Sequence, residues 1–379
     1  MNTLINGLSQ EERLPLALRA LYRQYGYRIY KLADFEPYDL YHENKSFLAG
    51  SNIITFTDVS GKLMTLKPDV TISIAKDIKP EETCRKLFYS EHVFRRQKGS
   101  DQYREIKQMG LEYIGADSGY AQAEVISLAL LTLAAISEDY VLGLSHMGFV
   151  SALLDHPAIG SALQDQLLNA LRQKSANEMA SLLADVPIPA AQRDAIVEMA
   201  MLSGDIVSVL PRLHAICQNN IMRAAVQELE ELAAVLTRLD MVGHVQVDMS
   251  LINDLDYYNG VVFRGYIRHI PYAVLAGGRY DNLLRRFGKT QQALGFGLYM
   301  NEINEALHRQ APYDVDTLLV YGNAKAADVA AAVQRLLETC PSVRAERTIP
   351  AALRARQTIT VEEVLQSENF AKKWRNSHD

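Results

Sequence analysis

The chain has 379 residues, of which 48% are hydrophobic and 22% are charged, and its formal net charge is −6. This composition is typical of a globular protein with a sizeable core, and the acidic balance argues against an extended nucleic-acid-binding surface, because phosphate contacts need clustered Lys and Arg. Three widely spaced cysteines, Cys84, Cys217 and Cys340, argue against a disulfide framework, and neither they nor the histidines are spaced as metal ligands.

The first predicted element is a helix that begins at Ser9, where Ser9 and Glu12 form a capping box, and that ends near Gly26. The residues before it show no signal-peptide pattern, which favours a cytoplasmic protein. A strand is predicted over residues 27–35. A hairpin is predicted over residues 52–68, with its turn near Ser60 and Gly61.

The middle of the chain predicts strands first and helices later. Residues 85–96 and 104–115 are expected to form an antiparallel pair, because a polar loop joins two strands of similar length. A buried helix follows from about Tyr120 to Ile136, too short and too interrupted to span a membrane. A short strand covers residues 140–146. Residues 148–240 are rich in Ala, Leu and Gln with helical periodicity, which predicts an all-helical insertion.

Strands return after the insertion, at residues 244–251, 256–267, 271–277 and 293–298, and the last of them leads into a helix. A boundary is expected at Ala311–Pro312, so the chain divides into residues 1–310 and a short α/β region of residues 311–379. That region begins with a strand and an Ala-rich helix, and its second half shows few β-α-β signals. Antiparallel strands with helices before and after them indicate an α+β architecture.

Three segments carry polar residues in patterns suited to ligand binding. On the strand of residues 104–115, Gln108, Gly110 and Glu112 share one face because side chains alternate along a strand, although a solvated face has the same pattern. Tyr257 and Tyr258 lie on a predicted strand and would point to opposite faces, which suits a pocket wall or a Tyr-rich core. Residues 276–281 contain two glycines, Arg279 and Tyr280, which suits a close backbone approach or an ordinary turn.

The sequence Gly288-Lys289-Thr290 is similar to the end of a phosphate-binding P-loop. The glycine that the motif requires five residues before Gly288 is absent, because Leu283 stands there. This motif is therefore excluded as a nucleotide site.

In this order, the segments resemble the class II aminoacyl-tRNA synthetase core, and within it histidyl-tRNA synthetase. LKPDVT (66–71) is similar to the LRPE/D-x-T segment, residues 88–115 to motif 2, DLDYYNGVVF (254–263) to the histidine-binding RGLDYY segment, and residues 276–288 and 295–303 to the Gly-rich turn and motif 3. The resemblance implies a class II antiparallel sheet flanked by helices. The helical insertion falls between motifs 2 and 3, as in that family.

Two departures from the synthetase pattern concern cations. The motif 3 Arg that holds ATP phosphates is replaced by Glu302, and the Arg of RGLDYY is replaced by Asn253, while the motif 2 Arg is kept as Arg95. At about 4 Å and an effective dielectric near 20, each unit charge pair is worth roughly 4 kcal/mol, so a carboxylate in place of a cation opposes adenylate formation. The motif 1 Pro is also missing, with Ala33 in its place, although a homodimer is still expected.

The family that combines this core with these losses is the regulatory subunit of short-form ATP phosphoribosyltransferase, the first enzyme of histidine biosynthesis. The resemblance implies a non-catalytic chain that binds the catalytic subunit and transmits inhibition by histidine. It implies no cofactor, nucleic-acid partner or membrane partner. The histidine-binding residues that it implies are Asp69, Thr71, Arg95, Gln108, Glu112, Tyr257, Tyr258 and Tyr280.

In that assignment Asp69 and Glu112 pair with the α-ammonium group of histidine, Gln108 hydrogen-bonds the ligand, and Arg95 binds its carboxylate. Tyr258 and Tyr280 flank the imidazole. Two other functions are consistent with the same motifs. One is an active histidyl-tRNA synthetase, and the other is a synthetase paralogue that serves as a binding module in another pathway, such as translation control.

Overall fold

The computed structural model describes residues 8–44, 53–79, 84–96, 102–115, 119–252, 257–310 and 313–366. By its internal contacts the chain divides into two compact units. The large unit comprises residues 17–303, and the small unit comprises residues 304–379 together with residues 1–16. No helix in the described ranges is both long and apolar enough to cross a bilayer.

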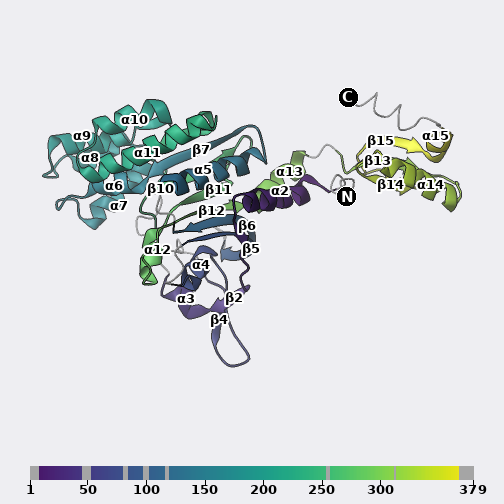
Figure 1. The fold of residues 1–379 in the computed structure, drawn as a ribbon, viewed down its shortest axis with the longest axis horizontal. Helices are drawn as coiled ribbons and strands as arrows, with labels where there is room; N and C mark the ends of the chain where they lie inside the picture. The colour runs from purple at the N-terminus through teal and green to yellow at the C-terminus, as the bar shows by residue number, and fades with distance from the viewer. Residues whose placement is uncertain are drawn as a thin grey trace. The chain divides into compact units, whose positions relative to one another are not determined.

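A nine-stranded mixed sheet forms the body of the large unit, with the strand order β1-β5-β6-β12-β11-β10-β7-β9-β8 (Figure 1). Pairing is antiparallel from β5 to β7 and between β8 and β9, and parallel for β1–β5 and β7–β9. The class II fold expected from the sequence is thus confirmed. The strands are β1 (Arg28–Ile29), β5 (Arg85–Arg96), β6 (Tyr103–Ile114), β7 (Tyr140–His146), β8 (Ser203–Asp205), β9 (Val245–Asp248), β10 (Val261–Ile267), β11 (Leu275–Arg279) and β12 (Ala293–Tyr299).

Helices α2 (Gln10–Gln24) and α5 (Gly119–Ala134) pack on one face of this sheet. Tyr22 of α2 is fully buried, and its ring lies 5.8 Å from the ring of Phe88 on β5. The start of α2 has the predicted capping box, since the backbone N–H of Ser9 donates to Glu12 Oε2 at 2.8 Å and that of Glu12 to Ser9 Oγ at 3.3 Å. The helix stops as predicted, because Gly26 has a φ of +83° that favours glycine.

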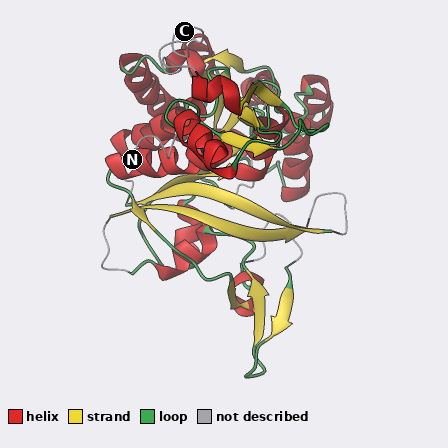
Figure 2. Cartoon of the chain, turned by 90° about the vertical axis from the view of Figure 1, so that its right-hand side faces the viewer, coloured by secondary structure: helices red, strands yellow, loops and turns green. Residues whose placement is uncertain are grey.

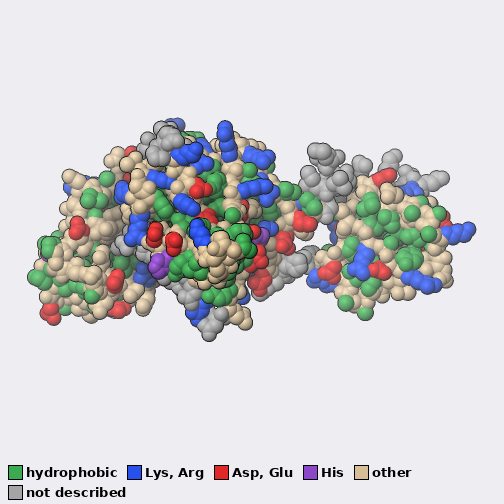
Figure 3. Space-filling model, turned by 90° about the horizontal axis from the view of Figure 1, so that it is seen from below, with side chains coloured by type: hydrophobic (Ala, Val, Ile, Leu, Met, Phe, Trp, Pro, Cys, Tyr) green, Lys and Arg blue, Asp and Glu red, His purple; other side chains and the backbone are tan. Residues whose placement is uncertain are grey.

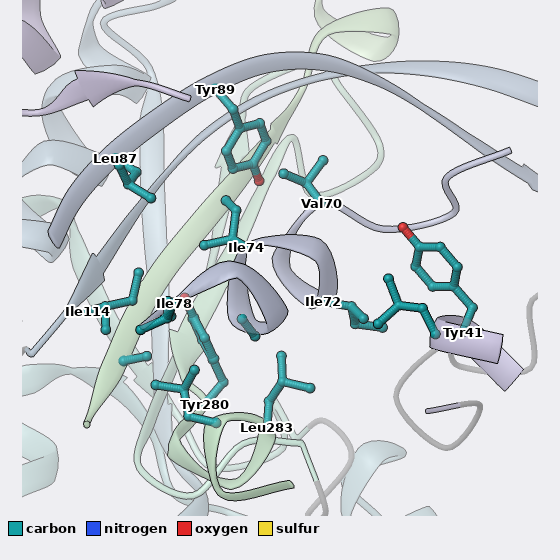
Figure 4. Packing of buried hydrophobic residues seen from close by; sticks show 14 of the residues in the cluster. Tyr41, Val70, Ile72, Ile74, Ile78, Leu87, Tyr89, Ile114, Tyr280 and Leu283 are labelled. Carbon is teal, nitrogen blue, oxygen red and sulfur yellow. The ribbon is translucent and has the colours of Figure 1, made fainter. Parts of the chain in front are cut away.

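The opposite face of the sheet packs against two short helices, α4 (Thr71–Asp77) and α12 (Asp281–Arg286). Figure 4 shows Tyr89 of β5 pointing from the sheet towards Val70 and Ile74 at α4, within one apolar cluster that also contains Tyr280. This cluster fixes α4, and with it the residues at its N-terminus, over the middle of the sheet.

A small three-stranded sheet with the order β2-β4-β3 lies on the same side as α4 (Figure 2). It contains the predicted hairpin, and its elements are β2 (Phe35–Pro37), β3 (Thr55–Thr57) and β4 (Leu63–Leu66), with α3 (Tyr38–His42) after β2. The single strand predicted over residues 27–35 is wrong. The chain leaves the large sheet after β1 and joins the small one at β2, where the Lys67 N–H donates to the Asp34 carbonyl at 3.0 Å.

The segment predicted to be helical forms a layer of helices at the β7 end of the sheet (Figure 1). They are α6 (Met147–Leu154), α7 (Ser161–Arg172), α8 (Ala176–Leu183), α9 (Ala190–Met199), α10 (Ile206–Ala215) and α11 (Asn220–Arg238), followed by the 3₁₀ turn η2 (Val242–His244). One strand was not predicted within it. The three residues of β8 pair with β9 and so join the layer to the sheet edge.

A polar contact also ties this layer to the sheet. His146 ends β7 and caps α6, because its Nδ1 accepts from the Phe149 N–H at 3.3 Å. Glu228 of α11 lies 3.4 Å from His146 Nε2 and 3.8 Å from the guanidinium of Arg279, the last residue of β11. Since Tyr280 follows Arg279, α11 is connected to the chain segment that enters the apolar cluster around α4.

The small unit contains a parallel sheet with the order β14-β13-β15. Its elements are β13 (Val315–Val320), α14 (Ala326–Leu337), β14 (Val343–Glu346), β15 (Ala355–Thr360) and α15 (Val361–Gln366), and α13 (Met300–Gln310) precedes it along the chain. The sequence predicted β13 and α14 but showed few β-α-β signals beyond them. In β14 and β15, half-buried residues are interspersed with exposed ones such as Arg344 and Arg356, so the apolar pattern of each strand is weak. The division at residue 310 stays a prediction.

Lys289, the lysine of the rejected P-loop motif, has a structural role. Its side chain is buried, and its Nζ donates to the carbonyls of Ala75 and Lys76 at 2.6 and 2.7 Å. These carbonyls lie in the last turn of α4 and have no partner within the helix, so a lysine there both satisfies them and complements the helix dipole.

We therefore expect Lys289→Met to lower the free energy of unfolding by about 1–3 kcal/mol, the cost of leaving buried acceptors without a donor. The measurement is the urea unfolding midpoint. Lys31→Met, at an exposed lysine, is the control and should leave the midpoint unchanged. Equal midpoints for both variants would show that Lys289 does not stabilise α4.

Candidate functional site

Glu112 of β6 carries a carboxyl group inside the large sheet, where only 2% of the residue is exposed. Its Oε1 accepts a hydrogen bond from Thr71 Oγ1 at 2.9 Å, and its Oε2 accepts one from the Tyr280 hydroxyl at 2.6 Å. Burial raises the pKa of the Glu112 carboxyl to about 8, although both hydrogen bonds act to lower it. One side chain thus joins three segments that lie far apart in the sequence.

The segment before α4 supplies a second carboxylate. Asp69 Oδ1 accepts from the Ile72 N–H at 2.9 Å, and Oδ2 accepts from Arg95 at 2.9 Å. Arg95 also donates through Nε to the Pro68 carbonyl at 2.6 Å. The resemblance assigned Asp69 to the α-ammonium group of a ligand and Arg95 to its carboxylate, whereas in the structure they form an ion pair with each other.

Three tyrosines form a wall beside Glu112. The ring of Tyr257 lies 4.5 Å from that of Tyr258 and 6.1 Å from that of Tyr280. The expectation that Tyr257 and Tyr258 share a strand and point to opposite faces is wrong. Both precede β10, in a turn, and both pack against the cluster around α4. Burial raises the pKa of all three hydroxyl groups, so they stay protonated at neutral pH.

Glycines form the floor of the site. Gly295 lies opposite Glu112, Gly297 opposite Gly110, and Gly278 opposite Gly295 on the next strand. A Cβ at Gly295 would lie 1.7 Å from Glu112 Oε2, one at Gly110 2.5 Å from the Tyr89 hydroxyl, and one at Gly278 2.7 Å from the Tyr258 ring. Side chains of the site therefore occupy the space above these three glycines. Any residue with a Cβ at these positions would compete for that space.

Five of the eight predicted residues, Thr71, Glu112, Tyr257, Tyr258 and Tyr280, are connected by these contacts. Asp69 and Arg95 form a separate ion pair before α4, and Gln108 lies on the same face of β6 as Glu112. Gln108 is 6% exposed, and its Nε2 is 3.8 Å from the position that a Cβ on Gly297 would take. Tyr89 was missed. It shares the face of Arg95 on β5, and the period-two alternation that located Gln108 and Glu112 on β6 could have located it as well.

The two positions where synthetase cations are lost differ in what the structure describes. Asn253 lies outside the described residues. Glu302 lies in the first turn of α13, directly after β12, which is the strand-to-helix turn expected for motif 3. Its Oε2 is buried and has no hydrogen-bond partner among the described residues.

Charged side chains and potential metal ligands also lie outside this site in the described part of the chain. On the face shown in Figure 3, Lys and Arg side chains are interspersed with Asp and Glu. In the part of the chain that the structure describes, no three His, Cys, Asp or Glu residues are grouped as metal ligands. The chemistry of the site is thus that of carboxylates, hydroxyls and one guanidinium, a set suited to a small polar molecule that carries an amino group and a carboxylate.

Gly295→Ala should place a methyl group on the Glu112 carboxylate and so disrupt the site. We expect overpacking to lower the free energy of unfolding by about 1–3 kcal/mol. Urea unfolding of the variant measures this cost. Gly243→Ala, where a Cβ meets no atom within 4 Å, is the control. A Gly295→Ala variant as stable as wild type would mean that the carboxylate is not held where the structure has it.

The raised pKa of Glu112 predicts how stability depends on pH. Because the native carboxyl keeps its proton up to about pH 8 while the unfolded one loses it near the ordinary value of 4.5, the folded state binds more protons in between, and stability falls as pH rises. At about 1.4 kcal/mol per pKa unit, this one group lowers the free energy of unfolding by roughly 5 kcal/mol across that window.

Glu112→Gln mimics the protonated carboxyl and removes this titration. We expect the variant to match wild type near pH 5 and to be more stable by several kcal/mol above pH 8. Urea unfolding of both proteins at a series of pH values tests this. A constant difference between them at all pH values would contradict the assignment.

Comparisons with known proteins identify the family of the chain. The family model described as histidyl-tRNA synthetase matches residues 4–303. The ATP phosphoribosyltransferase regulatory subunit of Alkaliphilus metalliredigens is 28% identical over 289 residues, which cover 75% of this chain and 73% of that protein.

Two solved structures share the fold. One is described as an ATP phosphoribosyltransferase regulatory subunit/histidyl-tRNA synthetase from Bacillus halodurans, with a TM-score of 0.72 and 22% identity over 97% of this chain and 92% of that one. The other is from the ATP phosphoribosyl transferase (HisG:HisZ) complex of Thermotoga maritima, with a TM-score of 0.61 and 17% identity over 76% and 97%. Because the family model covers most of its length, the chain belongs to the histidyl-tRNA synthetase family.

Proposed function

We propose that this chain is a non-catalytic regulatory subunit of ATP phosphoribosyltransferase that binds histidine in the site around Glu112. The observation that carries the proposal is Glu302 in the strand-to-helix turn between β12 and α13, where the synthetases of the family have the Arg that holds ATP phosphates. The amino-acid side of the site keeps its residues, while this position on the phosphate side has changed sign.

Electrostatics argues against adenylate formation. A cation near developing phosphate charge lowers the barrier, and a carboxylate in its place raises it. At about 4 Å and an effective dielectric near 20 the change from attraction to repulsion approaches roughly twice 4 kcal/mol as an upper bound. A site with that defect retains its use as a binding site.

The contacts support histidine as the ligand. Glu112 is a buried carboxylate whose hydrogen-bond donors, Thr71 and Tyr280, are uncharged hydroxyls, so an α-ammonium group would complete its pairing. Arg95 uses two of its five N–H groups to donate to Asp69 and Pro68, and its remaining N–H groups would bind the ligand carboxylate. Gln108 would hydrogen-bond the ligand, and Tyr257, Tyr258 and Tyr280 would enclose the imidazole.

Relatives support the partner. Homologues that align with most of this chain are named ATP phosphoribosyltransferase regulatory subunit, and one structural neighbour comes from a complex of that enzyme. We extend both names to this chain: its partner is a short-form catalytic subunit, it forms a homodimer, and it acts in the cytoplasm in histidine biosynthesis. Three cysteines without disulfides are consistent with that compartment.

Feedback by histidine requires that the ligand bind two states of the assembly with different affinity. A ligand with equal affinity for both states would shift neither. A coupling of about 1–3 kcal/mol suffices for a useful response. Under this proposal the difference arises at the Glu112 site, and the catalytic subunit reads it through contact with this chain.

The test mixes the purified chain with a short-form catalytic subunit and measures complex formation by light scattering and product formation from ATP and phosphoribosyl pyrophosphate, with and without histidine. We expect a complex, a higher rate with this chain present, and a lower rate when histidine is added. Glu112→Gln should still form the complex but bind histidine about 2–5 kcal/mol more weakly, a loss of at least roughly thirty-fold.

Glu105→Gln is the matched control, because Glu105 lies on the same strand with an exposed side chain that pairs only loosely with His92, at 3.8 Å. It should keep the wild-type response to histidine. Histidine-dependent pyrophosphate exchange by the isolated chain would contradict the proposal and favour an active histidyl-tRNA synthetase instead.

A further inference from the structure

The Glu112 carboxylate is buried without a cation. Its two hydrogen bonds come from Thr71 and Tyr280, and among the described residues it takes part in no ion pair. A carboxylate taken out of water without an opposite charge is more stable when it keeps its proton. The guanidinium of Arg95, on the neighbouring strand β5, is engaged with Asp69 instead.

The groups that act on Glu112 itself are Thr71, Tyr280 and Asp69, and none of them is a cation. The titratable and charged groups that act on its neighbours are Asp69 before α4, Tyr89 and Arg95 on β5, Tyr257 and Tyr258 before β10, Arg264 on β10, Tyr280 before α12, and Tyr299 at the end of β12. The two cations, Arg95 and Arg264, act on tyrosines of the site and not on Glu112. Asp69 itself raises the pKa of Glu112, after the larger effect of burial.

The carboxyl group is also held in place. Its Oε2 occupies the space where a side chain of Gly295 would begin, 1.7 Å from the Cβ position, and a hydroxyl group contacts each of its oxygens. It is therefore fixed in the buried position and has a partner of opposite charge only when a ligand brings one.

We propose that Glu112 carries a proton in the empty site and gives it to solvent when the ammonium group of the ligand enters, so that each histidine bound releases close to one proton. The bond that breaks is the O–H bond of the carboxyl, and the proton leaves to water or buffer while the ammonium keeps its own three. This inference rests on the proposed function. The pKa of about 8 for the empty site supports it.

The consequence is a pH-dependent affinity. Below the pKa of Glu112, each unit of pH lowers histidine affinity close to tenfold, because the carboxyl must first lose its proton. Free histidine also titrates at its imidazole near pH 6.5. Wild type is therefore compared with Glu112→Gln, in which the imidazole contributes equally and the carboxyl does not.

Calorimetry of histidine binding at pH 7.0 in phosphate and in Tris measures the proton directly, because the two buffers differ greatly in ionisation enthalpy. For wild type, we expect the binding heats in the two buffers to differ by the ionisation heat of close to one proton per site. The Glu105→Gln variant should show the same difference. Glu112→Gln should bind more weakly, with nearly equal heats in both buffers.

Equal heats for wild type in the two buffers would overturn the inference and leave histidine binding, and so the proposed function, intact. Proton release that persists in Glu112→Gln would overturn it as well, since another group would be the source. The wild-type comparison needs no variant, so the release of close to one proton is tested even if Glu112→Gln does not fold. Absence of histidine binding, both by the isolated chain and by its mixture with the catalytic subunit, would refute the proposed function and this inference with it.

Discussion

The buried carboxylate of Glu112 is the interaction on which the site depends. Thr71, from the start of α4, and Tyr280, from the turn before α12, both donate to it. These hydrogen bonds join β6 to the α4 segment and to the Gly-rich turn. Glu112 and Tyr280 are 168 residues apart in the sequence. Since burying a carboxylate is unfavourable, the fold keeps it only where neutral donors surround it and where a cation can arrive.

Much of the architecture could be predicted from the sequence because it follows from local rules. Alternation along residues 104–115 placed Gln108 and Glu112 on one face, and the capping box at Ser9 located the start of α2. The errors occurred where tertiary contacts override local pattern. Tyr257 and Tyr258 read as strand residues, yet they lie in a turn held against the α4 cluster. The strands β14 and β15 carry too few apolar residues to be recognised alone.

The candidate site could be located but its pairing could not. Asp69 was expected to bind the ammonium group of a ligand and Arg95 its carboxylate. Their ion pair arises from the chain path before α4, which no local pattern reveals. Arg279 is similar, since its contact with Glu228 links the helical layer to the residue before Tyr280. Both contacts join residues that lie far apart in the sequence, which is why local patterns do not reveal them.

The glycine floor limits how the site can be altered. Gly110, Gly278 and Gly295 lie under side chains that already fill the space above them. A larger residue at any of these positions would therefore displace a side chain of the site. Under the proposed function, re-engineering the chain as a biosensor for another amino acid would require changes to the tyrosines that would enclose the imidazole. The sheet beneath acts as a fixed template, and selectivity is accessible to a designer only through the lateral residues.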